Sequence, residues 1–202
     1  MTRGLSMHNE QKITDHIYWI GGNDFVSSRF ENLIPISRGI SYNSYFIDDE
    51  KTAVMDTVDS VIRDVFMDNV SHLLQGRKLD YIIINHMEPD HSGSLLALAT
   101  AYPEAKIVAT SQAQKMVGQY FHISMKDRFI TSDEKLEIEL GAHRLHFLKA
   151  PMVHWPEVTF TYEEREKVLF CADAFGTFGV LNGSVFADDV DYDEEYLPSC
   201  RK

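Results

Sequence analysis

Hydrophobic positions along the chain follow two periodicities, one typical of strands and one typical of helices. Short apolar runs predict strands at 13–20, 42–47, 52–56, 79–84 and 105–109. Apolar residues at helical spacing predict a helix over 58–74, between the third and fourth of these strands. Two more helices are expected over 92–101 and 111–121, the latter with Ser111 at its N-cap.

From residue 134 onward the pattern changes to strands. These are expected at 136–140, 143–148, 158–162 and 168–171, and the last two read as a hairpin. Interleaved strands and helices followed by strands predict an α/β fold with sheets flanked by helices, rather than a bundle or a barrel. Because neither a repeat nor a linker interrupts the chain, we expect residues 1–202 to form one domain.

Composition and charge exclude several classes of protein. The hydrophobic fraction is 44% and the net charge is −12, so the chain is globular but lacks the basic surface that nucleic acids and anionic membranes require. Its two cysteines, Cys171 and Cys200, exclude a disulfide scaffold and a thiolate zinc site. With neither a signal-peptide core nor a run of about 20 apolar residues, we expect a cytoplasmic protein.

The segment with the most potential metal ligands lies between the predicted strand at 79–84 and the helix that follows. It reads His86-Met87-Glu88-Pro89-Asp90-His91. Pro89 favours an extended backbone at Glu88, which would project residues 86, 88 and 90 to one side. For Asp90 alone, capping of the next helix is the better interpretation. For the whole cluster metal binding is better, because buried charges are costly unless they coordinate or pair.

Two downstream residues extend this cluster. His154 and Asp173 each follow a predicted strand. Taken singly, such a histidine is usually structural and such an aspartate usually belongs to a turn. Their order after the 86–91 cluster is what makes them informative.

That order resembles the metallo-β-lactamase-type domain of the flavodiiron proteins, also called A-type flavoproteins. Their signature has the form H-x-E-x-D-H, then a distant His, then an Asp. Supporting segments lie at 35–45, 55–58, 91–94 and 171–179. The resemblance runs from about residue 13 to about residue 197. It implies a metallo-β-lactamase-like αββα four-layer sandwich.

The resemblance also implies a pair of iron ions. Asp173 would bridge them, His86, Glu88 and His154 would hold one, and Asp90 and His91 would face the other. Zinc hydrolases of this superfamily typically carry histidine where this chain has Glu88. The resulting set of three imidazoles and three carboxylates, without a thiolate, suits iron or manganese. In this family such a centre reduces dioxygen to water or nitric oxide to nitrous oxide.

Two features depart from the family pattern. The family has another histidine ligand after the bridging aspartate, whereas this chain has no histidine beyond His154. We therefore expect water or a partner chain to complete the second iron site, and a C-terminally shortened fold with an exposed sheet edge. The chain also has no phosphate loop for flavin mononucleotide. FMN would act only in trans, and electrons would come from an external donor such as rubredoxin or a flavin protein.

Several alternatives stay open at this point. The chain is a piece of a longer flavodiiron protein, a sensor that binds oxygen or nitric oxide without steady turnover, or a zinc-type hydrolase in which metal-activated water attacks an ester or thioester. The family forms a head-to-tail dimer that brings one subunit's flavin beside the other's irons. We accordingly expect a homo-oligomer.

Residues around the motif receive simpler interpretations. Tyr45 and Trp155 are candidates for the lining of a gas pocket, although aromatic packing is the default. Cys171 is expected to act as a small buried apolar residue. His143 and His146 lie at an odd offset on one predicted strand, so they face opposite sides and cannot chelate the same ion.

Overall fold

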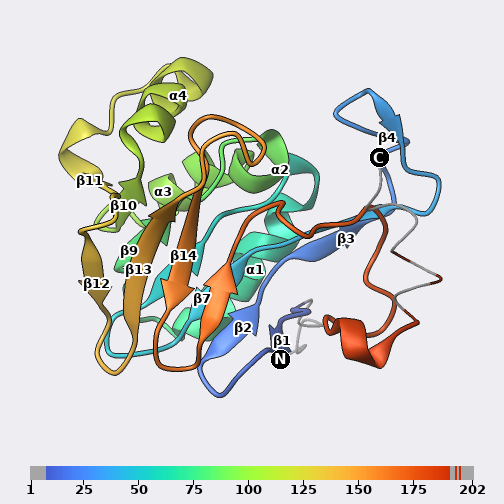
Figure 1. Cartoon of the computed structure of the whole chain (residues 1–202), viewed down its shortest axis with the longest axis horizontal. Coiled ribbons are helices and arrows are strands. Elements are labelled where there is room, and N and C mark those ends of the chain that lie inside the picture. The colour runs from blue at the N-terminus through green and yellow to red at the C-terminus, as the bar shows by residue number, and fades with distance from the viewer. Residues whose placement is uncertain (1–7, 192–193, 195, 197–202) are drawn as a thin grey trace, which may run out of the picture.

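Two β-sheets packed face to face form the centre of the molecule (Figure 1). The computed structural model describes residues 8–191, 194 and 196. The larger sheet has seven strands in the order β1 (Gln11–Lys12), β2 (Ile17–Trp19), β7 (Tyr45–Ile47), β8 (Ala53–Met55), β9 (Tyr81–Ile83), β10 (Lys106–Ala109) and β11 (Phe129–Thr131). The smaller sheet has four, β12 (Glu137–Glu139), β13 (Arg144–Lys149), β14 (Thr159–Glu163) and β15 (Val168–Phe170).

Two short antiparallel pairs extend the structure beyond these sheets. They are β3 (Gly22–Asp24) with β6 (Ile40–Tyr42), and β4 (Arg29–Phe30) with β5 (Ile34–Pro35). In the larger sheet, β8, β9, β10 and β11 run parallel to one another, whereas β1, β2, β7 and β8 pair antiparallel. The carboxyl ends of the parallel strands therefore meet at one edge, where loops commonly carry a functional site.

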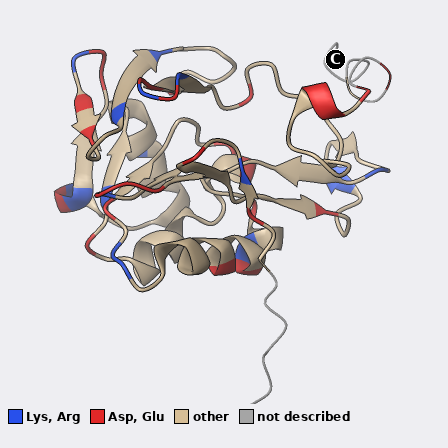
Figure 2. Cartoon of the chain, turned by 90° about the horizontal axis from the view of Figure 1, so that it is seen from below, with Lys and Arg blue, Asp and Glu red and all other residues tan. Residues whose placement is uncertain are grey.

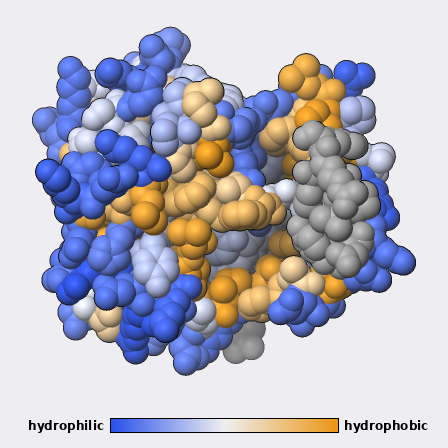
Figure 3. All heavy atoms as spheres, viewed as in Figure 1, coloured by the Kyte–Doolittle hydropathy of each residue, from blue (hydrophilic) through white to orange (hydrophobic). Residues whose placement is uncertain are grey.

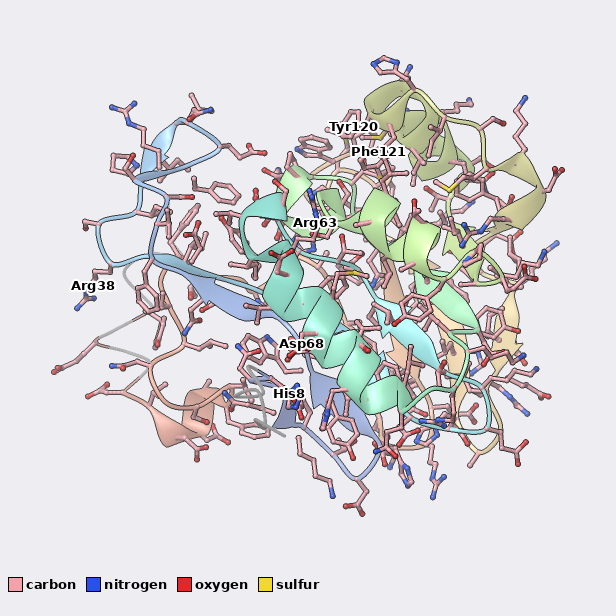
Figure 4. All side chains as sticks on the ribbon, turned by 180° about the vertical axis from the view of Figure 1, so that it is seen from behind. His8, Arg38, Arg63, Asp68, Tyr120 and Phe121 are labelled. Atoms are coloured by element: carbon pink, nitrogen blue, oxygen red, sulfur yellow. The ribbon has the colours of Figure 1, made fainter. Side chains whose placement is uncertain are left out.

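The helices cover one face of the larger sheet, as Figures 1 and 4 show from opposite sides. They are α1 (Arg63–Leu74), α2 (Pro89–Ser92), α3 (Leu95–Ala101) and α4 (Ser111–Phe121). Short 3-10 turns lie at η1 (Ser60–Ile62), η2 (Lys126–Arg128) and η3 (Ala187–Asp189). Within the described part of the chain, no helix combines the length and the apolar character needed to span a membrane.

Two separate cores explain why the central strands are apolar throughout. Val54 and Ile82 face the helices and pack with Phe66 of α1. Their neighbours Ala53 and Ile83 face the smaller sheet and join its buried side chains. A strand buried on both faces reads as a continuous apolar run, which is how these strands were predicted.

The outer face of the smaller sheet differs from the expected four-layer sandwich. Leu148 and Leu169 on this sheet are 46% and 43% exposed. No helix in the described part of the chain packs over them, so three of the four expected layers are present. Within the same residues β15 pairs only with β14 and forms an open edge of the sheet.

Residues at the beginning of the described chain are tied to α1. His8 and Asp68 point toward one another in Figure 4, with Nδ1 of His8 lying 3.0 Å from Oδ2 of Asp68. The backbone N–H of Asn9 donates to the side-chain oxygen of Asn69 at 3.0 Å. The amide of buried Asn69 also donates to the carbonyl of Ile20. These bonds connect the first strands of the larger sheet with the helical layer.

Helix boundaries differ from the sequence prediction at two places. Thr110, and not Ser111, caps α4, because its hydroxyl accepts from the N–H of Ala113 at 3.2 Å. The predicted helix over 58–74 begins with a 3-10 turn, which Asp59 caps through the N–H of Val61.

Charged residues are dispersed along the chain. Figure 2 shows Lys and Arg positions interspersed with Asp and Glu positions, and acidic residues on η3 near the C-terminal end.

Candidate metal centre

Four of the predicted ligands converge beyond the carboxyl end of β9. His86, Glu88, His154 and Asp173 each offer an atom within 4.8 Å of the others. Oε2 of Glu88 lies 3.0 Å from Nε2 of His86 and 2.7 Å from Nε2 of His154. Oδ2 of Asp173 lies 3.2 Å from both of these nitrogens. Residues far apart in sequence thus surround one small volume.

A second cluster shares Asp173 with the first. It contains Asp90, His91 and Asp173. Oδ1 of Asp173 lies 2.7 Å from Nε2 of His91, which is 3.5 Å from Oδ2 of Asp90. One oxygen of Asp173 therefore faces each cluster, the position that a carboxylate bridging two ions would take.

The 86–91 segment is folded differently from its prediction beyond Glu88. Glu88 is extended, with φ −58° and ψ 148°, as the following proline favours. From Pro89 to Ser92 the chain makes a helical turn, so Asp90 is presented by a helix and not by an extended strand. The capping interpretation of Asp90 is wrong, since Glu88 occupies the N-cap and a buried Oδ1 of Asp90 has no hydrogen-bond partner in the described structure.

Asp56, which follows β8, holds the backbone that carries the metal-binding motif. Its Oδ1 accepts from the backbone N–H groups of Asn85 and His86 at 2.7 and 3.3 Å. Its backbone is left-handed, with φ 54°, a conformation that is strained for a residue other than glycine. Thr57 donates its N–H and its hydroxyl to the carbonyl of His91 at 2.7 and 2.8 Å. The chain after β8 thus fixes both histidines of the motif.

Glu157 is a site residue that sequence reasoning missed. Its Oε1 lies 2.8 Å from Nδ1 of His86 and accepts from the N–H of Met87 at 3.0 Å. Its side chain is fully buried. A carboxylate on one ring nitrogen leaves the other to bind a metal and sets the orientation of the ring. The sequence offered one sign of this role: Glu157 is an acidic residue three positions after His154, and no Lys or Arg stands beside it in the sequence.

The pKa values of His86 and His91 depend on the surrounding carboxylates. Burial lowers the pKa of His86, but hydrogen bonds to Asp173, Glu157 and Glu88 outweigh it and raise the pKa to about 11. The pKa of His91 is likewise raised well above its ordinary value, with Asp90 and Asp173 overcoming burial. Protons and metal ions therefore compete for these two imidazoles.

The pKa values of two carboxylates in the centre shift in opposite directions. Burial and the negative charges of Asp173 and Glu88 raise the pKa of Asp90 to about 6, although His91 opposes them. For Asp173, burial is outweighed by hydrogen bonds from His86 and His91, so its pKa lies far below the usual range. Three converging carboxylates, three imidazoles and the unpaired oxygen of Asp90 fit a pair of divalent ions with mixed nitrogen and oxygen ligands.

Metal uptake by this centre is expected to release protons and to strengthen as pH rises. The raised pKa values leave His86 and His91 protonated at neutral pH, and a metal binds only the neutral imidazole. We expect release of about two protons per filled centre near pH 7.5, and an apparent affinity about tenfold lower for each pH unit below it per proton released. Ferrous-ion titration with a pH indicator checks this. A flat pH dependence without proton release would contradict the protonated metal-free state.

A cavity of about 480 Å³ opens beside the two clusters. Its lining includes Glu88, His154 and Asp173 from the clusters, and Phe30 and Ile34 from the β4–β5 hairpin. Figure 3 shows hydrophobic residues gathered on the projecting lobe at the upper right, where β4 lies in Figure 1. The centre thus adjoins a partly apolar space.

Tyr45 and Trp155, the two candidates for the lining of a gas pocket, are not among the described residues that line this cavity. Tyr45 packs in the core between the sheets, 5.3 Å from Phe170 between ring centroids. The ring of Trp155 stands perpendicular to the imidazole of His86 at 5.3 Å. Cys171 is half-buried, and burial raises the pKa of its thiol. Cys200 lies outside the described residues.

Comparison with known proteins identifies the architecture. The structure is similar to the flavodiiron protein from Giardia intestinalis, with a TM-score of 0.84 and 30% identity over 92% of this chain. It is also similar to rubredoxin oxygen:oxidoreductase from the anaerobe Desulfovibrio gigas, with a TM-score of 0.85 and 29% identity over 92% of this chain. Two facing sheets with the clusters at one end define a metallo-β-lactamase-like domain.

The family follows from the sequence match. Residues 40–199 match the ODP family beta lactamase model, so the chain belongs to this family and is a flavodiiron-type metallo-β-lactamase-like domain. The predicted resemblance to the flavodiiron proteins and the metallo-β-lactamase-like α/β fold class are confirmed. An anaerobic nitric oxide reductase flavorubredoxin from Aliivibrio fischeri is 37% identical over 184 residues, 90% of this chain. The chain spans 37% of that relative and 44% and 46% of the two solved structures.

Proposed function

We propose that this domain is a non-haem diiron oxidoreductase unit. It reduces nitric oxide to nitrous oxide, or dioxygen to water, with electrons from an external donor. The observation that carries the proposal is Glu88, whose carboxylate joins His86, His154 and Asp173 in one cluster. A carboxylate in this place makes the ligand set richer in oxygen than a histidine would, which suits a pair of iron ions.

The residues of this chain would bind the two ions, orient the ligands and line the gas site. His86, Glu88 and His154 would hold one ion, Asp90 and His91 would hold the other, and Asp173 would bridge them. Two ferrous ions, when bound, supply the electrons for reduction of the gas. Glu157 and Asp56 would keep His86 and His91 oriented. Phe30 and Ile34 would give a small apolar gas molecule a place beside the centre.

Nitric oxide and dioxygen need different numbers of electrons. Two nitric oxide molecules, two electrons and two protons give one nitrous oxide and one water, so a reduced pair of ferrous ions suffices for one turnover. Dioxygen needs four electrons to become two waters, so it needs a donor within each turnover. Relatives named flavorubredoxin and rubredoxin oxygen:oxidoreductase support a rubredoxin-type donor, with FMN acting in trans. A head-to-tail homo-oligomer would bring such a flavin close to the irons.

The test is anaerobic reconstitution with ferrous iron, followed by addition of nitric oxide. We expect about two irons per chain and one nitrous oxide per centre without a donor, then steady consumption once reduced rubredoxin or a flavin protein is added. The zinc-loaded protein is the control, because zinc has no redox chemistry. If the iron form consumes no gas with any donor, the redox proposal fails. If the zinc form instead cleaves acyl-thioester or lactam substrates, the domain is a hydrolase.

A further inference from the structure

A third cluster of potential ligands lies at the other end of the β13–β14 pair. His143 directly precedes β13, Glu163 is the last residue of β14, and Glu166 follows in the turn to β15. Their ligand atoms lie within 4.8 Å of one another. Leu145 pairs with Glu163 at this end, whereas Lys149 pairs with Thr159 at the end near Glu157. In Figure 1 this cluster is at the lower end of the sheets, and α2 with the first centre is at the upper end.

His143 is held in the orientation of a metal ligand. Its side chain is fully buried, and its Nδ1 lies 2.7 Å from Oδ2 of Asp49, which also accepts from the backbone N–H of His143 at 2.8 Å. Nε2 of His143 is buried but has no hydrogen-bond partner in the described structure. With Nδ1 donating to Asp49, Nε2 presents a lone pair to the cluster. A carboxylate, a histidine and a metal commonly follow one another in this way.

The distance between His143 and Glu166 is too long for a hydrogen bond and suits two ligands of one ion. Nε2 of His143 lies 3.7 Å from Oε1 of Glu166. With metal–ligand distances of about 2.0–2.2 Å, two ligands at a tetrahedral angle are about 3.3–3.5 Å apart. A small movement of Glu166 at the turn would bring both atoms within reach of an ion.

The two glutamates are already oriented by other bonds. Glu163 is fully buried, and its two oxygens accept from the N–H groups of Arg165 and Glu166, each at 2.8 Å. Oε2 of Glu166 accepts from the hydroxyl of Thr14. Each carboxylate keeps lone pairs for a further partner. In the described part of the chain, no Lys or Arg forms an ion pair with Asp49, Glu163 or Glu166. A metal ion would balance the negative charge that these carboxylates bring together.

We propose that His143, Glu163 and Glu166 bind a divalent transition-metal ion of the zinc type, with Asp49 orienting the imidazole and water completing the coordination. One imidazole and two carboxylates are a ligand set that zinc accepts. The ion would connect the β14–β15 hairpin with the start of β13. Through Asp49 and Thr14 it would also reach the turns after β7 and β1, which belong to the other sheet. Its role would be to fasten the two sheets together.

The test compares zinc binding by the full chain and by single variants, with zinc counted by elemental analysis after gel filtration. We expect His143→Asn to bind one zinc fewer per chain than the wild type, whatever number the other centre holds. His146→Asn is the matched control, because His146 lies on the other face of the same strand and pairs with Glu164. It is expected to bind the wild-type number. An equal loss in both variants, or in neither, would overturn the proposal.

A milder variant covers the case in which His143→Asn does not fold. Glu166→Gln keeps the volume of a half-buried turn residue. We expect it to weaken zinc binding at this cluster about tenfold or more, measured by competition with a chromophoric chelator. Zinc should also raise the thermal midpoint of the wild type more than that of Glu166→Gln. Identical affinities and identical midpoints would show that this cluster binds no ion. Neither readout depends on gas reduction, so the outcome is separate from that of the proposed function.

Discussion

Replacing Asp173 by asparagine is expected to remove most gas reduction and to lower the iron bound at the two clusters from about two ions per chain to one or fewer. Asp173 is the residue common to both clusters, with Oδ2 facing His86 and His154 and Oδ1 facing His91. Asparagine keeps the shape of the side chain but removes its charge and presents an amide nitrogen to one cluster. We expect gas consumption to fall about 100-fold or more, because neither ion then has a shared anionic ligand.

Metal content separates a bridging role for Asp173 from a role on one ion alone. Asp90→Asn touches only the second cluster, so it is expected to lose one ion and keep the other. Asp127→Asn is the matched surface control, because Asp127 is exposed on η2 and belongs to neither cluster. Iron analysis and nitric oxide consumption are measured on all three variants. An Asp173→Asn protein that retains two irons and full activity would rule out the bridge.

Much of this centre could be predicted because its chemistry lies in one short segment. His86, Glu88, Asp90 and His91 fall within six residues after an apolar strand. The turn at Pro89–Ser92 could not be predicted, because four residues are too few to show a helical period. Glu157 was missed for a different reason. Its role depends on a bond to His86 across 71 positions, which no local pattern records.

In the fold, too, features that depend on neighbouring residues were predictable, whereas features that depend on distant contacts were not. Strands β8, β9 and β10 were predicted because burial on both faces makes them apolar throughout. Strand β11 and the β3–β6 and β4–β5 pairs were missed, since two or three residues carry no periodic signal and pairing is decided by tertiary contacts. His143 and His146 do face opposite sides, as predicted. The partners of His143 nevertheless came from elsewhere, and Asp49 is 94 positions away.

Replacing Glu157 by glutamine is expected to leave the fold intact and to lower metal affinity about 10–100-fold, the usual effect of altering the carboxylate behind a ligating histidine. Glu157 touches neither the cavity nor the converging ligand atoms, so it acts as a positioning residue. The glutamine oxygen can still accept from the N–H of Met87 and from Nδ1 of His86. What glutamine removes is the negative charge that raises the pKa of His86.

The pH dependence of metal uptake distinguishes this role from a purely structural one. Loss of the charge lowers the pKa of His86, so we expect Glu157→Gln to release fewer protons at pH 8 on binding ferrous iron and to shift its affinity curve to lower pH. Glu157→Ala leaves the backbone N–H of Met87 and the ring Nδ1–H of His86 without their acceptor, at a cost of about 1–3 kcal/mol for each in the free energy of unfolding. Glu134→Gln, at an exposed position, should match the wild type in both measurements. If Glu157→Gln also matches it, His86 owes neither its raised pKa nor its orientation to the carboxylate of Glu157.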